Sequence, residues 1–145
     1  MTDAGKGSNN MTEKINEASF KFEKLIIWEM SMEFGENIFN LSKTFPKNEM
    51  YNLSSQICRA SDSIALNISE GSIGQSNLEY KRFINYSIRS LAEVVTCLHK
   101  AKRRKYIKDD EFTKYYQFSF HLMNMLIAFK KKIISDIGSR KNNEK

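Results

Sequence analysis

Proline and glycine are scarce in this chain of 145 residues, which contains a single proline, Pro46, and six glycines. Both residues interrupt helices, so their scarcity in a sequence rich in Leu, Ile, Met, Phe, Lys and Glu favours an all-helical protein. Cysteine is scarce too, and Cys58 and Cys97 both fall within helical patterns. We therefore expect small buried hydrophobes at these two positions, and no disulfide framework or redox centre.

Long apolar runs are missing. No stretch of eighteen apolar residues occurs, which argues against a membrane-spanning helix, and the N-terminus MTDAGKGSNNMTEKINEA lacks the apolar core of a signal peptide. We expect a cytoplasmic protein of one domain with no membrane partner.

Histidine occurs only at His99 and His121, and there is no Glu-x-x-His pair of the kind that holds metals in oxidative helix bundles. The sequence Gly71-Ser72-Ile73-Gly74 lacks the lysine of a phosphate-binding loop. His121 lies between Phe120 and Leu122 and is interpreted as structural. We predict no enzymatic activity, no metal site and no cofactor.

Positive charge is plentiful but unevenly distributed. The formal net charge is +6, and residues 77–108 alone hold nine Lys and Arg against two Asp and Glu. Residues 130–145 hold six against two, whereas residues 1–76 are net negative. Charge localised in this way indicates an anionic partner for the middle of the chain.

Apolar residues that recur every three or four positions predict four helices after a flexible N-terminal tail at residues 1–17. We place these helices at residues 20–44, 48–71, 76 to about 105, and 109–137, with residues 138–145 as a flexible basic tail. Pro46 stops the first helix, Gly71 suits a left-handed C-terminal cap, and Ser76 with Glu79 forms a capping box. The expected core lines are Leu25, Trp28, Met32, Gly35 and Phe39; Leu53, Ile57, Ala60, Ile64 and Ile68; Ile84, Ile88, Leu91, Val95 and Leu98; and Phe112, Tyr115, Ser119, Leu122, Leu126, Phe129 and Ile133.

Connections this short join antiparallel neighbours, so we predict an antiparallel up-down-up-down four-helix bundle over residues 18–137. Several aromatic residues fall outside the narrowest core lines: Phe34, Phe45, Phe83, Tyr86, Tyr116, Phe118 and Phe120. Widening of the core explains any one of them, whereas the whole set favours an oligomer interface.

A polar strip accompanies the apolar stripe of the second helix, with these members at helical spacing: Gln56, Arg59, Ser63, Asn67 and Glu70. Arg59 and Glu70 are about 16 Å apart along a helix and cannot pair with each other. We predict a structural polar network, with an Arg59–Glu93 ion pair, in preference to an active site. Its residues are Gln56, Arg59, Asn67, Glu70 and Glu93.

The third helix and the turn after it carry the main functional signal, a set of cations with Tyr106 available for base stacking. The predicted nucleic-acid-binding residues are Lys81, Arg82, Arg89, Lys100, Lys102, Arg103, Arg104, Lys105 and Lys108. The alternative interpretation is that these cations form only the solvated end of a helix. Repetition of the patch in an oligomer favours nucleic-acid binding instead. Because no base-reading motif is present, contacts to the RNA or DNA backbone are expected.

Some of these residues also resemble a known family. The matching segments are Leu25 with Trp28, Phe45-Pro46 with Glu49, Leu53-Ser54-Ser55-Gln56-Ile57, Arg59-Ala60, Ser63-Ile64, Asn67-Ile68-Ser69-Glu70-Gly71, and Ser90-Leu91 with Glu93 and Leu98. Over residues 20–135 they are similar to bacterial four-helix-bundle proteins encoded in intervening sequences of large-subunit ribosomal RNA genes. The same fold family includes the accessory variability protein of diversity-generating retroelements. The resemblance implies a homopentameric barrel with a basic surface and, for the retroelement branch, nucleic-acid association beside a reverse transcriptase.

Two functions remain open. The first is a non-enzymatic nucleic-acid-binding accessory protein, RNA being the expected ligand, that acts as a basic homo-oligomer, in one branch alongside a reverse transcriptase. The alternative is a protein-interaction scaffold of the ribosomal intervening-sequence family with no direct nucleic-acid role.

Overall fold

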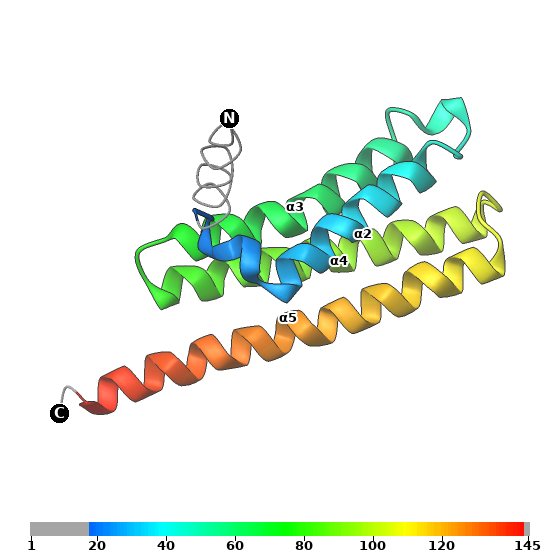
Figure 1. Cartoon of the computed structure of the whole chain (residues 1–145). Coiled ribbons are helices and arrows are strands. Elements are labelled where there is room, and N and C mark those ends of the chain that lie inside the picture. The colour runs from blue at the N-terminus through cyan, green and yellow to red at the C-terminus, as the bar shows by residue number, and fades with distance from the viewer. Residues whose placement is uncertain (1–17, 144–145) are drawn as a thin grey trace, which may run out of the picture.

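The computed structural model describes residues 18–143, which form four long helices and two short 3-10 helices. Helix η1 (Lys21–Lys24) leads into α2 (Ile26–Ser42), and η2 (Lys47–Glu49) precedes α3 (Leu53–Ile73). Helices α4 (Asn77–Arg103) and α5 (Asp109–Asn143) complete the chain. Successive helices run in opposite directions (Figure 1), which confirms the four-helix bundle. The tail expected at residues 1–17 lies outside the described residues.

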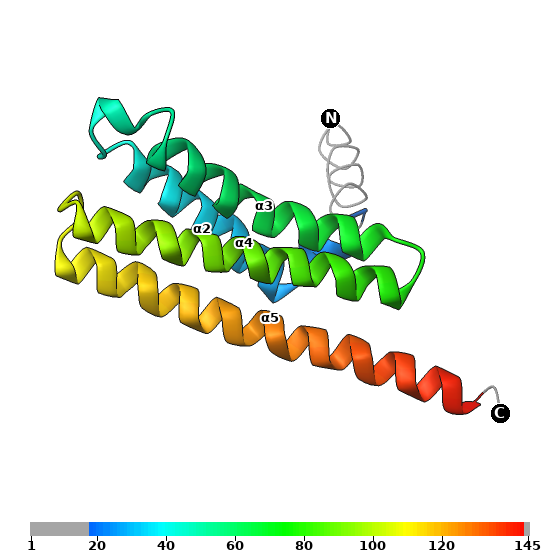
Figure 2. The same cartoon turned by 180° about the vertical axis from the view of Figure 1, so that it is seen from behind.

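Helix α5 extends further than its sequence pattern indicated. We expected it to end at Ile137, but it continues to Asn143. Seen from behind in Figure 2, it runs along α4 and its C-terminal end reaches past the start of α4. Part of the segment expected as a C-terminal tail is therefore helical.

The other boundaries that differ have local causes. The backbone of Leu25 is extended, with φ −79° and ψ 127°, and this separates η1 from α2. Helix α3 continues past Gly71, and no glycine in residues 18–143 has a positive φ, so the left-handed cap expected at Gly71 was wrong. A Cβ atom at Gly71 would instead lie 2.9 Å from Phe83 Cβ and 2.9 Å from Tyr80 Cδ1. Glycine is needed there because α4 packs closely against α3.

The start of α4 confirms the serine half of its predicted capping box, because the Ser76 hydroxyl accepts a hydrogen bond of 3.1 Å from the Glu79 backbone N–H; the Glu79 side chain does not bond back to the Ser76 N–H. Two serine contacts then join α4 to α3 along their length. Ser87 Oγ donates to the Ile64 carbonyl at 2.8 Å, and Ser63 Oγ lies 2.5 Å from Ser90 Oγ. These short side chains fix which face of α4 is turned towards solvent.

The core confirms the line expected for α3, all of whose members are buried, and most of the lines in α4 and α5. The line expected for α2 is confirmed only in part, because Gly35 is buried and Leu25 and Trp28 are half-buried against the core. Met32 and Phe39 are 41% and 46% exposed, whereas the buried line consists of Ile27, Phe34, Ile38 and Leu41. The ring of Phe34 stacks on that of Phe118 with 5.2 Å between centroids, which directs this side of α2 towards α5.

The aromatic residues outside the narrow core lines divide into two groups. Phe34 and Phe45 are buried and Phe118 is half-buried against the core, so these three widen it, and Phe83 is half-buried beside Gly71. Tyr86, Tyr116 and Phe120 are exposed on α4 and α5. Only this second group is available to an oligomer interface.

Candidate nucleic-acid interface

Helix α4 ends in a turn that holds one cation in an unusual backbone conformation. The Tyr106 N–H donates to the Ala101 carbonyl at 2.9 Å and the Lys105 N–H donates to the Lys102 carbonyl at 3.0 Å. This pair of bonds is the Schellman ending of a helix, which usually places glycine where Lys105 lies. Lys105 has φ 63°, the only positive φ among non-glycine residues 18–143. A left-handed lysine costs about 1 kcal/mol or more and marks this turn as strained.

A buried carboxylate ties this turn to the connection between α2 and α3. Glu49 Oε1 accepts hydrogen bonds from Arg104 Nη1 at 3.1 Å and from the Tyr106 hydroxyl at 3.0 Å. Glu49 Oε2 accepts from the Leu53 N–H and from Asn52 Nδ2, both at 3.1 Å. We call Glu49, Asn52, Arg104 and Tyr106 the Glu49 node. It joins two connections that lie at the same end of the bundle in Figure 1.

The Glu49 node also shifts the pKa of its carboxylate. Burial alone raises the pKa of Glu49, but the hydrogen bonds from Leu53, Tyr106 and Asn52 and the charge of Arg104 outweigh it, and the pKa falls below its ordinary value of 4.5. Glu49 is therefore ionised at neutral pH and neutralises Arg104.

Three of the residues proposed for nucleic-acid contact are already engaged within the chain. Arg104 and Tyr106 belong to the Glu49 node, so Tyr106, which also packs on Phe45 with 5.7 Å between ring centroids, is not free to stack on a base. Lys102 Nζ lies 3.9 Å from Asp109 Oδ1 and 4.5 Å from the centroid of the Phe112 ring. These contacts fix the turn and reduce the charge that it offers to a ligand.

Six other predicted cations have exposed side chains that form no ion pair or hydrogen bond within residues 18–143. We call them the exposed cations: Arg82, Arg89, Lys100, Arg103, Lys105 and Lys108. Arg82, Arg89, Lys100 and Arg103 recur at helical spacing and lie on one outward line of α4. From Arg82 to Arg103, 21 positions further along the helix, this line is about 32 Å long. The structure thus arranges the predicted cations as a stripe that ends in a denser turn.

The expected polar network is only partly assembled. Gln56 Nε2 donates to Glu93 Oε1 at 3.4 Å, and Asn67 Nδ2 donates to the Ser63 carbonyl at 2.8 Å. The Arg59–Glu93 ion pair does not form, because Arg59 projects outward from α3 and Gln56 occupies Glu93 instead. Glu70 is exposed as well.

Comparison with known proteins identifies the family. Residues 23–128 match the 23S rRNA-intervening sequence protein family. The chain belongs to this family. A solved structure from Bacteroides thetaiotaomicron, described as a protein with unknown function from the S23 ribosomal protein family, is 26% identical to it. That structure aligns with a TM-score of 0.69 over 73% of this chain and 96% of its own. No functionally curated protein matches the chain.

In this 23S rRNA-intervening sequence protein, a second group of cations gathers at the far end of α4. Tyr80, at the start of α4, packs edge-on against Phe129 of α5 with 5.4 Å between ring centroids, so Lys130 and Lys131, the next residues of α5, lie at this end of the bundle. The excess of cations in residues 130–145 was recognised in the sequence, and Lys130 and Lys131 fall within the helix predicted at residues 109–137, but the sequence pattern did not place them beside the start of α4.

Within residues 18–143 the protein contains no cluster of three or more His, Cys, Asp and Glu side chains suited to a metal ion. None of the helices described there combines the length and the apolarity needed to cross a membrane.

Proposed function

We propose that this 23S rRNA-intervening sequence protein is a non-enzymatic, cytoplasmic accessory protein that binds the backbone of RNA as a basic homo-oligomer. The stripe of exposed cations carries the proposal, because those side chains lie on α4 and the turn after it and form no ion pair within residues 18–143. Phosphate groups are the ligands that such a surface attracts without regard to base sequence.

Self-association strengthens this binding. The resemblance to the family supports a homopentamer, and the exposed Tyr86, Tyr116 and Phe120 supply apolar surface for contacts between copies. In a ring, every copy adds the same stripe, so one RNA strand contacts several stripes and its binding gains from effective concentration. A reverse transcriptase is the partner expected in the retroelement branch of the fold.

The alternative function, a protein-interaction scaffold without nucleic-acid contact, is favoured by the same apolar surface. Phe120 and Leu66 are 61% and 60% exposed on different helices. The two functions predict different behaviour when cations are removed without altering the apolar residues.

The test compares two triple variants in binding to a labelled single-stranded RNA, measured by fluorescence anisotropy. Lys100→Gln, Arg103→Gln and Lys105→Gln together remove three exposed cations. We expect RNA affinity to fall roughly ten- to a hundredfold near 0.1 M salt, from the loss of three phosphate contacts.

The matched control is Lys24→Gln, Lys43→Gln and Lys132→Gln, which removes the same charge from exposed lysines outside the stripe. We expect this variant to bind nearly as well as the parent. If both variants lost RNA affinity equally, the loss would depend on net charge and not on the position of the cations. Unchanged affinity in the first variant would contradict the proposed interface.

A further inference from the structure

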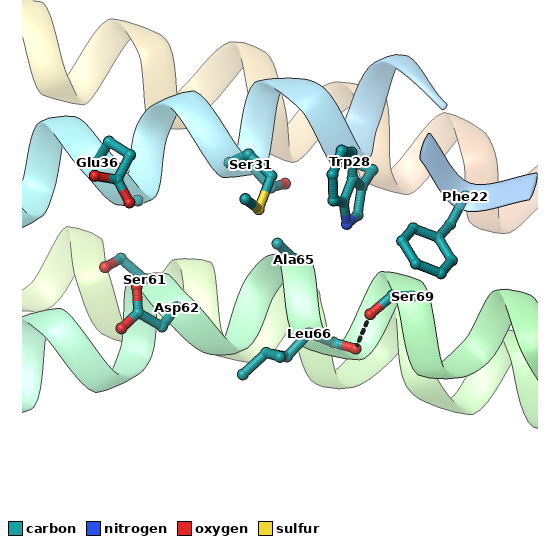
Figure 3. Close-up of a pocket in the computed structure, with 11 residues that line it drawn as sticks. Phe22, Trp28, Ser31, Glu36, Ser61, Asp62, Ala65, Leu66 and Ser69 are labelled. Carbon is teal, nitrogen blue, oxygen red and sulfur yellow. Dashed lines mark hydrogen bonds between the residues drawn. The ribbon is translucent and has the colours of Figure 1, made fainter. Parts of the chain in front are cut away.

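The face formed by α2 and α3 carries a groove that the RNA proposal does not use. Its volume is about 290 Å³, and its walls include Trp28 and Met32 of α2 and Leu66 of α3. The floor consists of short residues, among them Ser31, Gly35 and Ala65. Figure 3 shows Trp28 pointing between the two helices, with Phe22 beside it at one end of the groove.

Two carboxylates lie at the other end of this groove, Glu36 on α2 and Asp62 on α3 (Figure 3). Burial, together with the negative charge of Glu36, raises the pKa of Asp62 above its ordinary value. Neither carboxylate forms an ion pair within residues 18–143. The α2–α3 groove therefore has large apolar side chains and small residues along its length, and two carboxylates without an ion pair at one end.

The opposite side of the bundle carries a second apolar face, on α5 next to α4. Its exposed members are Tyr116, Phe120, Ile127 and Ile134, which are 39%, 61%, 37% and 43% exposed. Successive spacings of four and seven residues place them on one line of the helix, as in the seam of a coiled coil. Ala92 and Val95 of α4 flank Phe120 and extend the apolar surface. We call this surface the α5 seam.

The charge beside the α5 seam is positive. Lys130 and Lys131 follow Ile127 by three and four positions on α5, so they neighbour it on the helix surface. Residues 112–135 contain no aspartate or glutamate. The α5 seam is thus an apolar strip rimmed by lysines, and the α2–α3 groove is an apolar strip ending in carboxylates.

These two faces lie on opposite sides of one protomer, because the helices follow one another around the bundle in the order α2, α3, α4, α5 (Figures 1 and 2). Two different, mutually complementary surfaces on one molecule produce a head-to-tail contact, which closes into a ring when the rotation between copies allows it. We propose that the α5 seam of one copy docks in the α2–α3 groove of a second copy, with Phe120 against Trp28 and Leu66, and with Lys130 and Lys131 facing Glu36 and Asp62. This inference rests on the self-association in the proposed function and specifies the surfaces that meet.

The docking has a consequence for RNA binding. The outward line of α4 with Arg82 and Arg89 belongs to neither face, so it stays accessible when copies join. Each added protomer then contributes its stripe of exposed cations on the same side of the assembly.

The first test measures molecular mass in solution by light scattering for the parent, Phe120→Glu and Ile26→Glu. Ile26 is 67% exposed, close to the 61% of Phe120, but lies outside both faces. We expect the parent and Ile26→Glu to be oligomers, and Phe120→Glu to be a monomer at a concentration that fully assembles the parent.

If the parent is an oligomer and Phe120→Glu has the same mass, the docking surface is wrong while self-association stands. If the parent itself is a monomer, self-association fails and the docking inference fails with it.

The second test exchanges the charges of the two faces. Lys130→Glu with Lys131→Glu, and separately Glu36→Lys with Asp62→Lys, should each weaken assembly at least tenfold by placing like charges together. All four substitutions in one chain restore opposite charges across a head-to-tail contact, so assembly should return. If the fourfold variant stays dissociated like the two double variants, the pairing of these faces is refuted.

Discussion

The two ends of the bundle hold α4 in place by different physical means. At the turn end, where α4 meets α5, the Glu49 node joins the turn to the α2–α3 connection through hydrogen bonds and an ion pair. At the glycine end, where α3 meets α4, the contact is steric and depends on the missing side chain of Gly71 beside Tyr80 and Phe83. Polar contacts respond to pH and engage cations, whereas a steric contact does neither.

This difference shows why a count of cations overstates the candidate interface. The turn end has the highest density of positive charge in the sequence, yet Arg104 is neutralised by Glu49 and Lys102 lies against Asp109. Arg82 near the glycine end has no such partner within residues 18–143. The cations that stabilise the fold are therefore not the same residues as the cations available to a ligand in this protein.

The largest effect is expected at the glycine end. Gly71→Ala should lower the free energy of unfolding by about 1–3 kcal/mol, because the added Cβ overpacks the contact with Tyr80 and Phe83. Gly35→Ala is the control, since a Cβ there would lie 3.6 Å from Asp62 Oδ1, an ordinary contact. It should raise stability by up to about 1 kcal/mol through helix propensity. Urea unfolding measures both, and destabilisation of equal size in the two variants would contradict the steric account.

At the turn end, replacing Lys105 should change the stability of the fold and the affinity for RNA in opposite directions. Lys105→Gly should raise the free energy of unfolding by about 1 kcal/mol, because glycine adopts the left-handed conformation without a Cβ clash. The same variant should bind RNA more weakly, since one exposed cation is lost. Lys108→Gly removes a cation without relieving strain, so it should weaken binding with no gain in stability. If Lys105→Gly lowered stability, the strain assigned to this turn would be absent.

Acid should loosen the turn end and leave the glycine end intact. The pKa of Glu49 is lowered by folding, so its contribution to stability is complete above the ordinary value of 4.5 and is lost as the pH falls through the lower pKa of the folded state. Glu49→Gln should reduce Tm at neutral pH and flatten the decline of Tm below pH 4.5. Thermal unfolding followed by circular dichroism checks this. An unchanged acid profile in the variant would show that other carboxylates govern the decline.

The smallest expected effect is a difference between two adjacent arginines, Arg103 and Arg104, in the salt dependence of RNA binding. Arg103→Gln should make the slope of log affinity for RNA against log salt shallower by about 0.7, the value for one phosphate contact on a single strand, with little change in Tm. Arg104→Gln should lower Tm and leave the slope close to that of the parent, because Arg104 is engaged by Glu49. The reverse pattern would mean that Arg104 faces the ligand.

Much of the fold could be predicted from local patterns. The spacing of Ile57, Ile64 and Ile68 defined the buried face of α3, and Ser76 marked the start of α4. The α2 face was predicted only in part, because this helix carries apolar residues on two neighbouring lines, and only the stacking of Phe34 on Phe118 selects one of them. Periodicity within a helix cannot resolve a choice that depends on another helix.

The candidate site was less predictable, because its decisive contacts are distant in sequence or lack the usual residue type. Glu49 and Arg104 are 55 positions apart, and no short motif links them. The Schellman ending of α4 places a lysine where glycine is the usual signal, so the turn gave no sign of its conformation. The sequence thus indicated which segment is cationic, and the fold decided which cations are exposed.

The claim that several copies contact one RNA strand through their exposed cations is tested most directly by the salt dependence of RNA binding to the assembled parent protein. One copy displays six exposed cations, so contact with one copy gives a slope of log affinity against log salt no steeper than about −4. We predict a steeper slope, because several copies contribute their stripes to one strand. A slope near zero, or no RNA binding at modest ionic strength, would contradict the account.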